Sequence, residues 1–226
     1  GVESFIGKEF LSQCQADGIE THGVDAMKPS DAAYHQADIR DPAIGDLIPE
    51  GADAIVHMAA LSRDQDCRMN ACRTFDINVQ GTLNLMDQAK ARGVKQFIFA
   101  STEWVYVTFV EGVEKHEDDP IDAAKLGSEY AFSKYVSEVN LRQQHQHGFC
   151  DTSILRFGII YGPRPANWSA VESLLNSVAT KDEVTVGSLR TARRFLHVQD
   201  IARAVKLSLG LPGFNVINIQ GDKLVS

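Results

Sequence analysis

The chain has 226 residues, of which 44% are hydrophobic and 23% charged, enough for one large α/β domain or a domain with a small appendage. Its net charge of −8 argues against nucleic acid or an anionic membrane as the main partner. No apolar run approaches the ~18 residues of a membrane-spanning helix, no signal peptide is visible, and the four cysteines have neither a CxxC motif nor zinc-binding spacing. These features predict a cytoplasmic protein with reduced thiols and no bound metal.

The first seven residues form a glycine-rich turn, with Gly1, Ser4 and Gly7 spaced GxxSxxG, ahead of a helical pattern that Gly18 ends. In a dinucleotide-binding fold, glycines here permit a tight turn and let the backbone approach a pyrophosphate. Ser4 stands where the middle glycine is usual, and its hydroxyl could donate to a phosphate oxygen. A plain turn explains the spacing equally well. Such a turn normally follows a buried strand, and none precedes it here, while the chain stops at Leu224-Val225-Ser226 just after a strand-like run. We therefore expect the natural protein to extend at both ends.

A strand is expected over Ile19–Val24, and Asp25 follows it, 18 residues after Gly7. An acidic residue at this distance can accept hydrogen bonds from both hydroxyls of an adenosine ribose, and its charge repels the 2′-phosphate of NADP. Asp25 therefore favours NAD, although aspartates also end strands as turn formers.

Two further segments could face the same ligand. Asp38 follows a short strand and could hydrogen-bond an adenine amino group while Ile39 packs on the ring. Asp38 could equally cap a helix before Pro42. The run Asp53–Ala60 (DAIVHMAA) is typical of a buried parallel strand, and the small residues at its end would let a ligand lie close to the backbone.

A long helix is expected over Asn70–Arg92, followed by a buried strand over Val94–Ala100. On this helix, Asn78 is compatible with bridging neighbouring backbone groups and, equally, with contacting a cofactor. The strand ends in Ser101-Thr102-Glu103, so hydroxyls and a carboxylate lie at its carboxyl-terminal edge, where open α/β sheets bind ligands. The acidic segment Glu111–Pro120 is expected to be a solvated loop.

The next expected helix, from about Gly127 to His147, carries Tyr130 and Lys134 one turn apart on one face. A tyrosine titrates near ~10 in water, too high for a base at neutral pH. An ammonium group one turn away favours the phenolate and is expected to lower the pKa of Tyr130. An isolated YxxxK is usually a surface tyrosine and a solvated lysine, so the pair gains meaning only from the rest of the chain.

The alternation of buried strands and helices up to about Ile160 requires a doubly wound parallel sheet. We therefore expect an α/β fold with a Rossmann-type domain over residues 1–160. Residues 161–226 are expected to form mostly a small substrate lobe, with segments that return to the Rossmann domain. The later expected elements are a strand over Cys150–Ile160, a helix over Ser169–Thr180, a short strand over Glu183–Val186, a helix over Asp200–Leu209 and a strand over Phe214–Ile219.

Taken in order, these motifs resemble those of the extended short-chain dehydrogenase/reductases, in particular the NAD-dependent epimerase/dehydratase family. The resemblance covers essentially the whole chain, and so many motifs in the same order make it specific. The matching residues are the glycine turn, Asp25, Asp38-Ile39, HMAA at 57–60, NVQGT at 78–82, Ser101-Thr102, Val105-Tyr106, Tyr130xxxLys134, LRF at 155–157, YGPR at 161–164, Arg193, FLHV at 195–198 and Asp200.

The resemblance implies a role for each matching position. Tyr130 would be the catalytic base, Lys134 would bind the nicotinamide ribose and tune Tyr130, and Thr102 would hydrogen-bond the sugar hydroxyl. Glu103 and Arg193 would contact the substrate, Arg193 as the arginine that clamps a nucleotide diphosphate. Contacts with NAD are implied for Gly1, Ser4, Phe5, Ile6 and Gly7 at the pyrophosphate, Asp25 at the ribose, Asp38 and Ile39 at the adenine, and Met58, Ala59, Ala60 and Asn78 along the cofactor.

Several positions depart from the family pattern. Ser4 replaces a glycine, and Ile159 stands where an asparagine commonly holds the nucleotide diphosphate. The family's 4,6-dehydratases carry an Asp-Glu pair after the catalytic threonine, where this chain has Glu103 and Trp104. Because an indole cannot abstract a proton, dehydration is disfavoured.

The favoured interpretation is an NAD-dependent epimerase of a nucleotide sugar that works through a transient keto intermediate. One alternative is an NAD(P)-dependent oxidoreductase that acts on a keto-sugar or another secondary alcohol. Another is an NAD-binding protein without turnover, an alternative motivated by Ser4 and Ile159. The family commonly dimerises through the helices of Asn78 and Tyr130, so a homodimer is expected.

Overall fold

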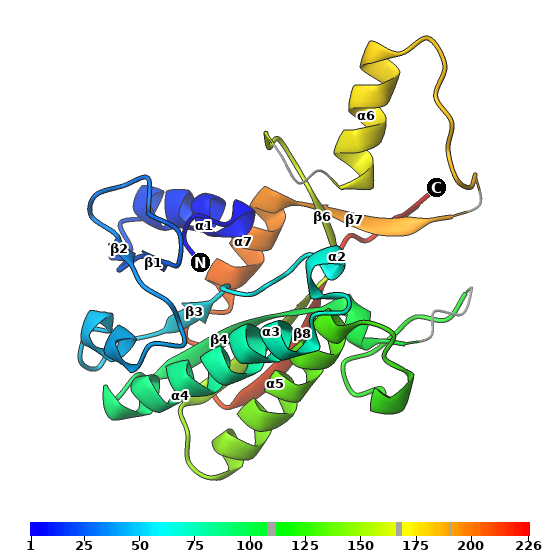
Figure 1. Ribbon diagram of the computed structural model, residues 1–226. Coiled ribbons are helices and arrows are strands. Elements are labelled where there is room, and N and C mark those ends of the chain that lie inside the picture. Colours follow the sequence, from blue (N-terminus) through cyan, green and yellow to red (C-terminus); the bar gives the residue numbers. More distant parts are fainter. Residues whose placement is uncertain (108–111, 166–168, 190) are drawn as a thin grey trace.

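A four-stranded sheet forms the centre of the computed structural model, which describes residues 1–107, 112–165, 169–189 and 191–226 (Figure 1). All its neighbouring strands run parallel. The predicted α/β fold with a parallel sheet is therefore confirmed. In spatial order the strands are β3 (Ile55–His57), β4 (Gln96–Thr102), β5 (Asp151–Phe157) and β8 (Phe214–Ile219).

Helices cover both faces of this sheet (Figure 1). One face carries α1 (Phe5–Ala16) and α7 (Val198–Leu207), which contact each other. The other face carries α3 (Ala71–Phe75), α4 (Gly81–Ala91) and α5 (Glu129–Gln146).

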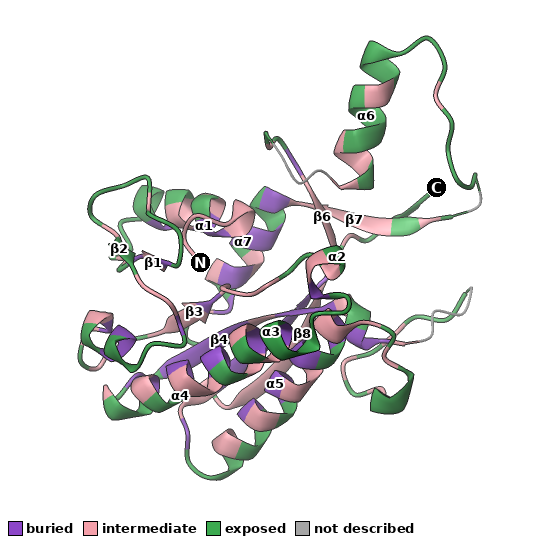
Figure 2. Cartoon of the chain, viewed as in Figure 1, coloured by how far each residue is buried: buried purple, intermediate pink, exposed green. Residues whose placement is uncertain are grey.

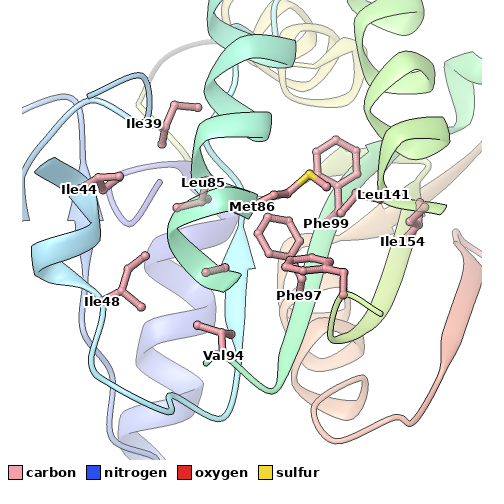
Figure 3. Packing of buried hydrophobic residues seen from close by; sticks show 12 residues of the cluster. Ile39, Ile44, Ile48, Leu85, Met86, Val94, Phe97, Phe99, Leu141 and Ile154 are labelled. Atoms are coloured by element: carbon pink, nitrogen blue, oxygen red, sulfur yellow. The ribbon is translucent and has the colours of Figure 1, made fainter. Parts of the chain in front are cut away.

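The apolar core has two layers because successive side chains of a strand point to opposite faces of the sheet. In β4, Phe97 and Phe99 pack into the layer of α4 and α5, whereas Ile98 packs into the layer of α1 and α7. Figure 3 shows the first layer, where the two phenyl rings lie near Met86 and Leu141. Both layers hold β4 rigidly, so the polar residues at its end have a fixed position.

Three helical segments differ in detail from the sequence prediction. The helix expected over Asn70–Arg92 contains a π-helical turn, η2 (Asp76–Gln80), between α3 and α4. The short helix α2 (Asp64–Cys67) precedes α3, and the 3-10 helix η1 (Pro42–Leu47) follows Asp41, whose carboxylate accepts from Ala43 N at 2.9 Å.

The strands nearest the amino terminus are short. The strand expected over Ile19–Val24 is reduced to β1 (Val24–Asp25), which pairs in parallel with β2 (His35–Gln36). Within the acidic segment expected to be a loop, residues 112–120 contain neither helix nor strand, as expected, and Glu111 lies outside the described residues.

The last part of the chain forms a second, three-stranded sheet, returns to the first sheet with β8, and ends in the second sheet with β9. The second sheet consists of β6 (Ile159–Tyr161), β7 (Arg193–His197) and β9 (Leu224–Val225). The helix α6 (Ala170–Thr180) stands clear of both sheets in Figure 1, and Figure 2 shows no buried residue on it. The expected strand over Glu183–Val186 is wrong: these residues are not in a strand and pair with no strand of the described residues.

Candidate active site

A cleft of about 250 Å³ opens at the carboxyl end of β4. The strand ends at Thr102, and α5 begins at Glu129, so Thr102, Tyr130 and Lys134 meet at this cleft. The remaining lining residues are Ser4, Phe5, Ile6, Met58, Ala60, Ser62, Ala100, Ser101, Phe157, Gly158, Ile160 and Arg164. The described residues contain no cluster of three or more potential metal ligands, and no described helix is long and apolar enough to cross a membrane.

The first turn of α5 has a fixed position because Ser128 caps it. Its hydroxyl accepts from Ala131 N at 3.4 Å and donates to Asp64 Oδ1 at 2.7 Å. One turn into the helix, the buried Lys134 donates from Nζ to the carbonyl oxygen of Ala100 at 2.7 Å, 4.6 Å from the centre of the Phe99 ring. Lys134 therefore joins α5 to β4.

Burial shifts the pKa values of both Tyr130 and Lys134, and it shifts that of Tyr130 in the direction opposite to the sequence prediction. Burial raises the pKa of Tyr130 to about 12, which the nearby Cys67 thiol reinforces and a hydrogen bond with Thr102 opposes. Burial also lowers the pKa of Lys134 to about 7, against the charge of Glu138, which raises it. The expectation that Lys134 lowers the pKa of Tyr130 is wrong for the protein groups alone, because desolvation dominates and the hydrogen bond that opposes it comes from Thr102.

Ser4 caps α1 and is fully used in doing so. Its hydroxyl donates to the carbonyl oxygen of Gly1 at 2.7 Å and accepts from Gly7 N at 3.0 Å. Because a hydroxyl has a single proton to donate, the expected donation from Ser4 to a phosphate is not available in this arrangement. The amides of Phe5 and Ile6, the first two of the helix, have no acceptor among the described residues.

Asp25 ends β1 beside this turn but does not line the cleft. Its two carboxylate oxygens accept from Glu3 N and Met27 N, each at 2.9 Å. Carboxylate oxygens have two lone pairs each, so these bonds orient Asp25 and leave acceptor capacity for ribose hydroxyls.

Three other positions from the sequence prediction have structural partners. The carboxylate of Asp38 accepts hydrogen bonds from the guanidinium group of Arg40. Ile39 is buried in the core and packs so closely on Gly81 that a Cβ there would lie 2.6 Å from Ile39 Cδ1. The buried Asn78 accepts from Leu61 N at 2.7 Å and donates to Leu61 O and Ser133 Oγ. Both of its amide protons are thus used by the protein, which favours the bridging interpretation of Asn78 over cofactor contact.

Glu103 opens the 3-10 helix η3 (Glu103–Val105) directly after Thr102. Burial raises its pKa to about 7, although the charge of Arg193 opposes this. A Cβ on Gly158, a residue lining the cleft, would lie 3.5 Å from Glu103 Oε2. Arg193 is exposed on β7 and does not line the cleft. The rings of Trp104 and Tyr130 meet edge-on, with their centres 6.5 Å apart.

We expect the Glu103 carboxyl group to titrate near neutral pH. Its pKa in the folded state lies above the ordinary value, so the free energy of unfolding should fall as pH rises from about 4.3, the unfolded value, towards 7. Carbon-13 NMR of the carboxyl group measures the midpoint, and Glu103→Gln should flatten this part of the stability profile. The exposed Glu183→Gln serves as the control and should leave the profile unchanged.

The sequence prediction missed several residues of the cleft. Gly158 joins β5 to β6, Ile160 lies in β6, and Arg164 lies just beyond β6. Their only sequence signal was the YGPR motif after a buried strand, which indicated the family but not that this segment crosses to α1.

The sequence model of the NAD dependent epimerase/dehydratase family matches residues 1–219. The chain belongs to this family. A UDP-glucuronate 4-epimerase of Thermodesulfobacterium geofontis is 30% identical, over 99% of this chain and 74% of its own length. A GDP-6-deoxy-D-mannose reductase of Pseudomonas aeruginosa is 29% identical, over 99% of this chain and 75% of its own. The crystal structure of a Thermus thermophilus UDP-glucose 4-epimerase with NAD has a TM-score of 0.85 at 25% identity, covering 98% of this chain and 76% of that one.

As a member of the NAD-dependent epimerase/dehydratase family, the protein is an enzyme with NAD as its cofactor. The turn before α1 fits a dinucleotide. A Cβ on Gly7 would lie 2.3 Å from Gly1 O, and one on Gly1 would lie 2.9 Å from Ala59 N, so only glycine permits this tight turn. The amides of Phe5 and Ile6 at the positive end of the helix dipole suit the pyrophosphate.

Proposed function

We propose that the protein is an NAD-dependent epimerase of a nucleotide sugar, with Tyr130 as the base. The observation that carries this proposal is the meeting of Thr102, Tyr130 and Lys134 at one cleft, which also reaches the amino terminus of α1. A proton-accepting group, a hydroxyl that positions an alcohol and a dinucleotide turn are what hydride transfer to and from a secondary alcohol requires.

In the proposed reaction, Tyr130 Oη takes the proton of a sugar hydroxyl and later returns it. Thr102 shares the hydrogen bond and fixes the position of that oxygen. Bound NAD supplies the hydride acceptor and a positive charge. Lys134, whose ammonium group donates to Ala100 O, would bind the ribose next to the nicotinamide. The sugar passes through a ketone, turns in the cleft, and receives the hydride on its other face.

A panel of UDP-, GDP-, CDP- and dTDP-sugars tests this function, with product stereochemistry read by NMR. An epimerase regenerates its cofactor, so NAD should remain bound through purification and turnover should need no added cofactor. Inverted product without net NADH is the expected result. The proposal fails if none of these sugars is converted by protein that holds NAD.

The second candidate is a net oxidoreductase in the same cleft. The similarity to the Pseudomonas aeruginosa reductase, which aligns with 99% of this chain at 29% identity, favours this alternative. It predicts stoichiometric formation or consumption of NADH or NADPH with substrate, which absorbance at the nicotinamide band measures directly. The same absorbance measurement distinguishes the two candidates, because an epimerase should show no net change in NADH or NADPH.

We also propose a homodimer through the layer of α3, α4 and α5. Phe132 and Val139 are 40% and 39% exposed and lie seven residues apart on one face of α5, and the Phe132 ring contacts Phe75 of α3 at 5.4 Å. Light scattering should give twice the mass of one chain, and Phe132→Asp should halve it. Leu175→Asp, on exposed α6, is the control. A wild-type mass of one chain would contradict the proposal.

A further inference from the structure

A guanidinium group lies beside the turn that begins α1. Arg164 has its guanidinium carbon 4.5 Å from the centre of the Phe5 ring, and it lines the same cleft as Ser4 and Ile6. We propose that Arg164 is a cofactor-binding residue whose guanidinium neutralises the pyrophosphate of NAD. The sequence prediction assigned no role to this side chain beyond its place in the YGPR motif.

The charges that line the cleft support this assignment. Among the described lining residues, Lys134 and Arg164 are the charged ones, and no carboxylate is present. Lys134 is bound to Ala100 O at the Tyr130 end. A pyrophosphate carries two negative charges, whereas a helix amino terminus supplies only about half a positive charge. Arg164 is therefore the charged side chain that the described lining residues place at the α1 end of the cleft, and an ion pair with Glu172 at 3.0 Å offsets part of its charge.

The hydrogen bonds of the Ser4 cap leave fewer backbone donors for a pyrophosphate at the start of α1, so a cationic side chain there matters more. Ser4 uses the amide of Gly7, a donor that a glycine at position 4 would have left for the phosphates, and its own hydroxyl proton is already donated to Gly1 O. Only the first amides of α1, at Phe5 and Ile6, remain without an acceptor among the described residues. A guanidinium group can take the place of the Gly7 amide, because its planar fork of N–H donors matches the oxygens of a phosphate.

The backbone after β6 is shaped to bring Arg164 to this place. Gly162 has φ of +152°, and a Cβ there would lie 3.1 Å from Phe5 Cζ and 3.0 Å from Val198 Cγ1, so a side chain would push the segment away from α1. Glu172, the capping-box residue of α6, holds Arg164 Nε at 3.0 Å and accepts from Gly162 N at 3.1 Å. These contacts fix the guanidinium against Phe5.

The test separates pyrophosphate binding from general damage to the site. Affinities of the full chain, freed of cofactor, are measured by calorimetry for NAD, ADP-ribose and adenosine. In Arg164→Gln, the dissociation constants for NAD and ADP-ribose should rise about 10- to 100-fold, the usual strength of a charge-assisted pair. The constant for adenosine, which has no phosphate, should stay the same. The salt dependence of NAD binding should also weaken.

Arg142→Gln is the matched control, since Arg142 also stacks on a phenyl ring, Phe214 at 4.4 Å, but does not line the cleft. It should leave all three constants unchanged. Equal weakening of adenosine and NAD in Arg164→Gln, or no change in NAD binding, would overturn the proposal. If Arg164→Gln does not fold, Arg164→Lys gives the same comparison, with a smaller selective loss because lysine keeps the charge without the fork. The measurement concerns binding alone, so it stands or falls separately from the proposed reaction.

Discussion

Replacing Tyr130 with phenylalanine is expected to reduce turnover of the nucleotide sugar by about 10²- to 10⁴-fold, the usual contribution of a positioned acid–base group. The substitution removes only the hydroxyl that would accept the substrate proton. Phenylalanine retains the ring, so its edge contact with Trp104 and the packing of α5 should persist. The measurement is the rate of product formation together with the NAD content of the purified protein, which should not change.

Tyr135→Phe is the matched control, because Tyr135 lies on the same helix but lines a different hollow, beside Val139 and Arg142. It should leave turnover unchanged. The pH profile adds a second reading. Burial holds the pKa of Tyr130 high, so wild-type turnover should increase with pH as the phenolate forms, and the residual activity of Tyr130→Phe should lose this dependence. An unchanged rate in Tyr130→Phe would remove Tyr130 from the mechanism and would favour a different base.

Periodicity and turn chemistry were enough to predict the fold class. The buried pattern of β4 and the helix of Tyr130 both follow from local spacing, and both are present. The strand expected over Glu183–Val186 fails because its apolar alternation has no neighbouring strand to pair with, which a local pattern cannot reveal.

The site was less predictable because its geometry depends on contacts between distant segments. Lys134 is one turn from Tyr130 in sequence, yet its ammonium group binds Ala100 O, 34 residues away. Asn78 was equally compatible with two roles until the fold placed Leu61 and Ser133 beside it. Arg164 reaches Phe5 only because β6 pairs with β7 and Gly162 allows close approach. Residue types were visible in the sequence, whereas partners were not.

Arg156→Met is expected to lower the free energy of unfolding by about 3–5 kcal/mol, the usual result of leaving one member of a buried ion pair alone. Arg156 Nη2 and Glu138 Oε2 are 2.7 Å apart, and both side chains are 5% exposed. Glu138 also accepts from Ser101 Oγ at 2.5 Å, and Arg156 donates to Tyr106 Oη at 2.7 Å. Without the guanidinium, the Glu138 carboxylate would be buried with Ser101 as its remaining hydrogen-bond partner.

Urea unfolding followed by circular dichroism measures this loss as a shift of the midpoint at constant slope. Lys95→Met is the control, since Lys95 pairs with Asp53 in an exposed bridge that should contribute under about 1 kcal/mol. The double variant Arg156→Met/Glu138→Leu removes both charges and should recover much of the stability. Equal losses in the single and double variants would show that packing, not the unpaired charge, dominates.

The double variant also separates stability from the chemistry of the cleft. Glu138 lies one turn after Lys134 on α5, and its charge raises the pKa of Lys134 against the effect of burial. Removing Glu138 should therefore lower the pKa of Lys134 further below about 7. Carbon-13 NMR of the lysine Cε measures this shift. A folded, stable double variant should then hold a neutral Lys134 at neutral pH and convert substrate more slowly, because the ribose would lose a cationic partner next to Tyr130.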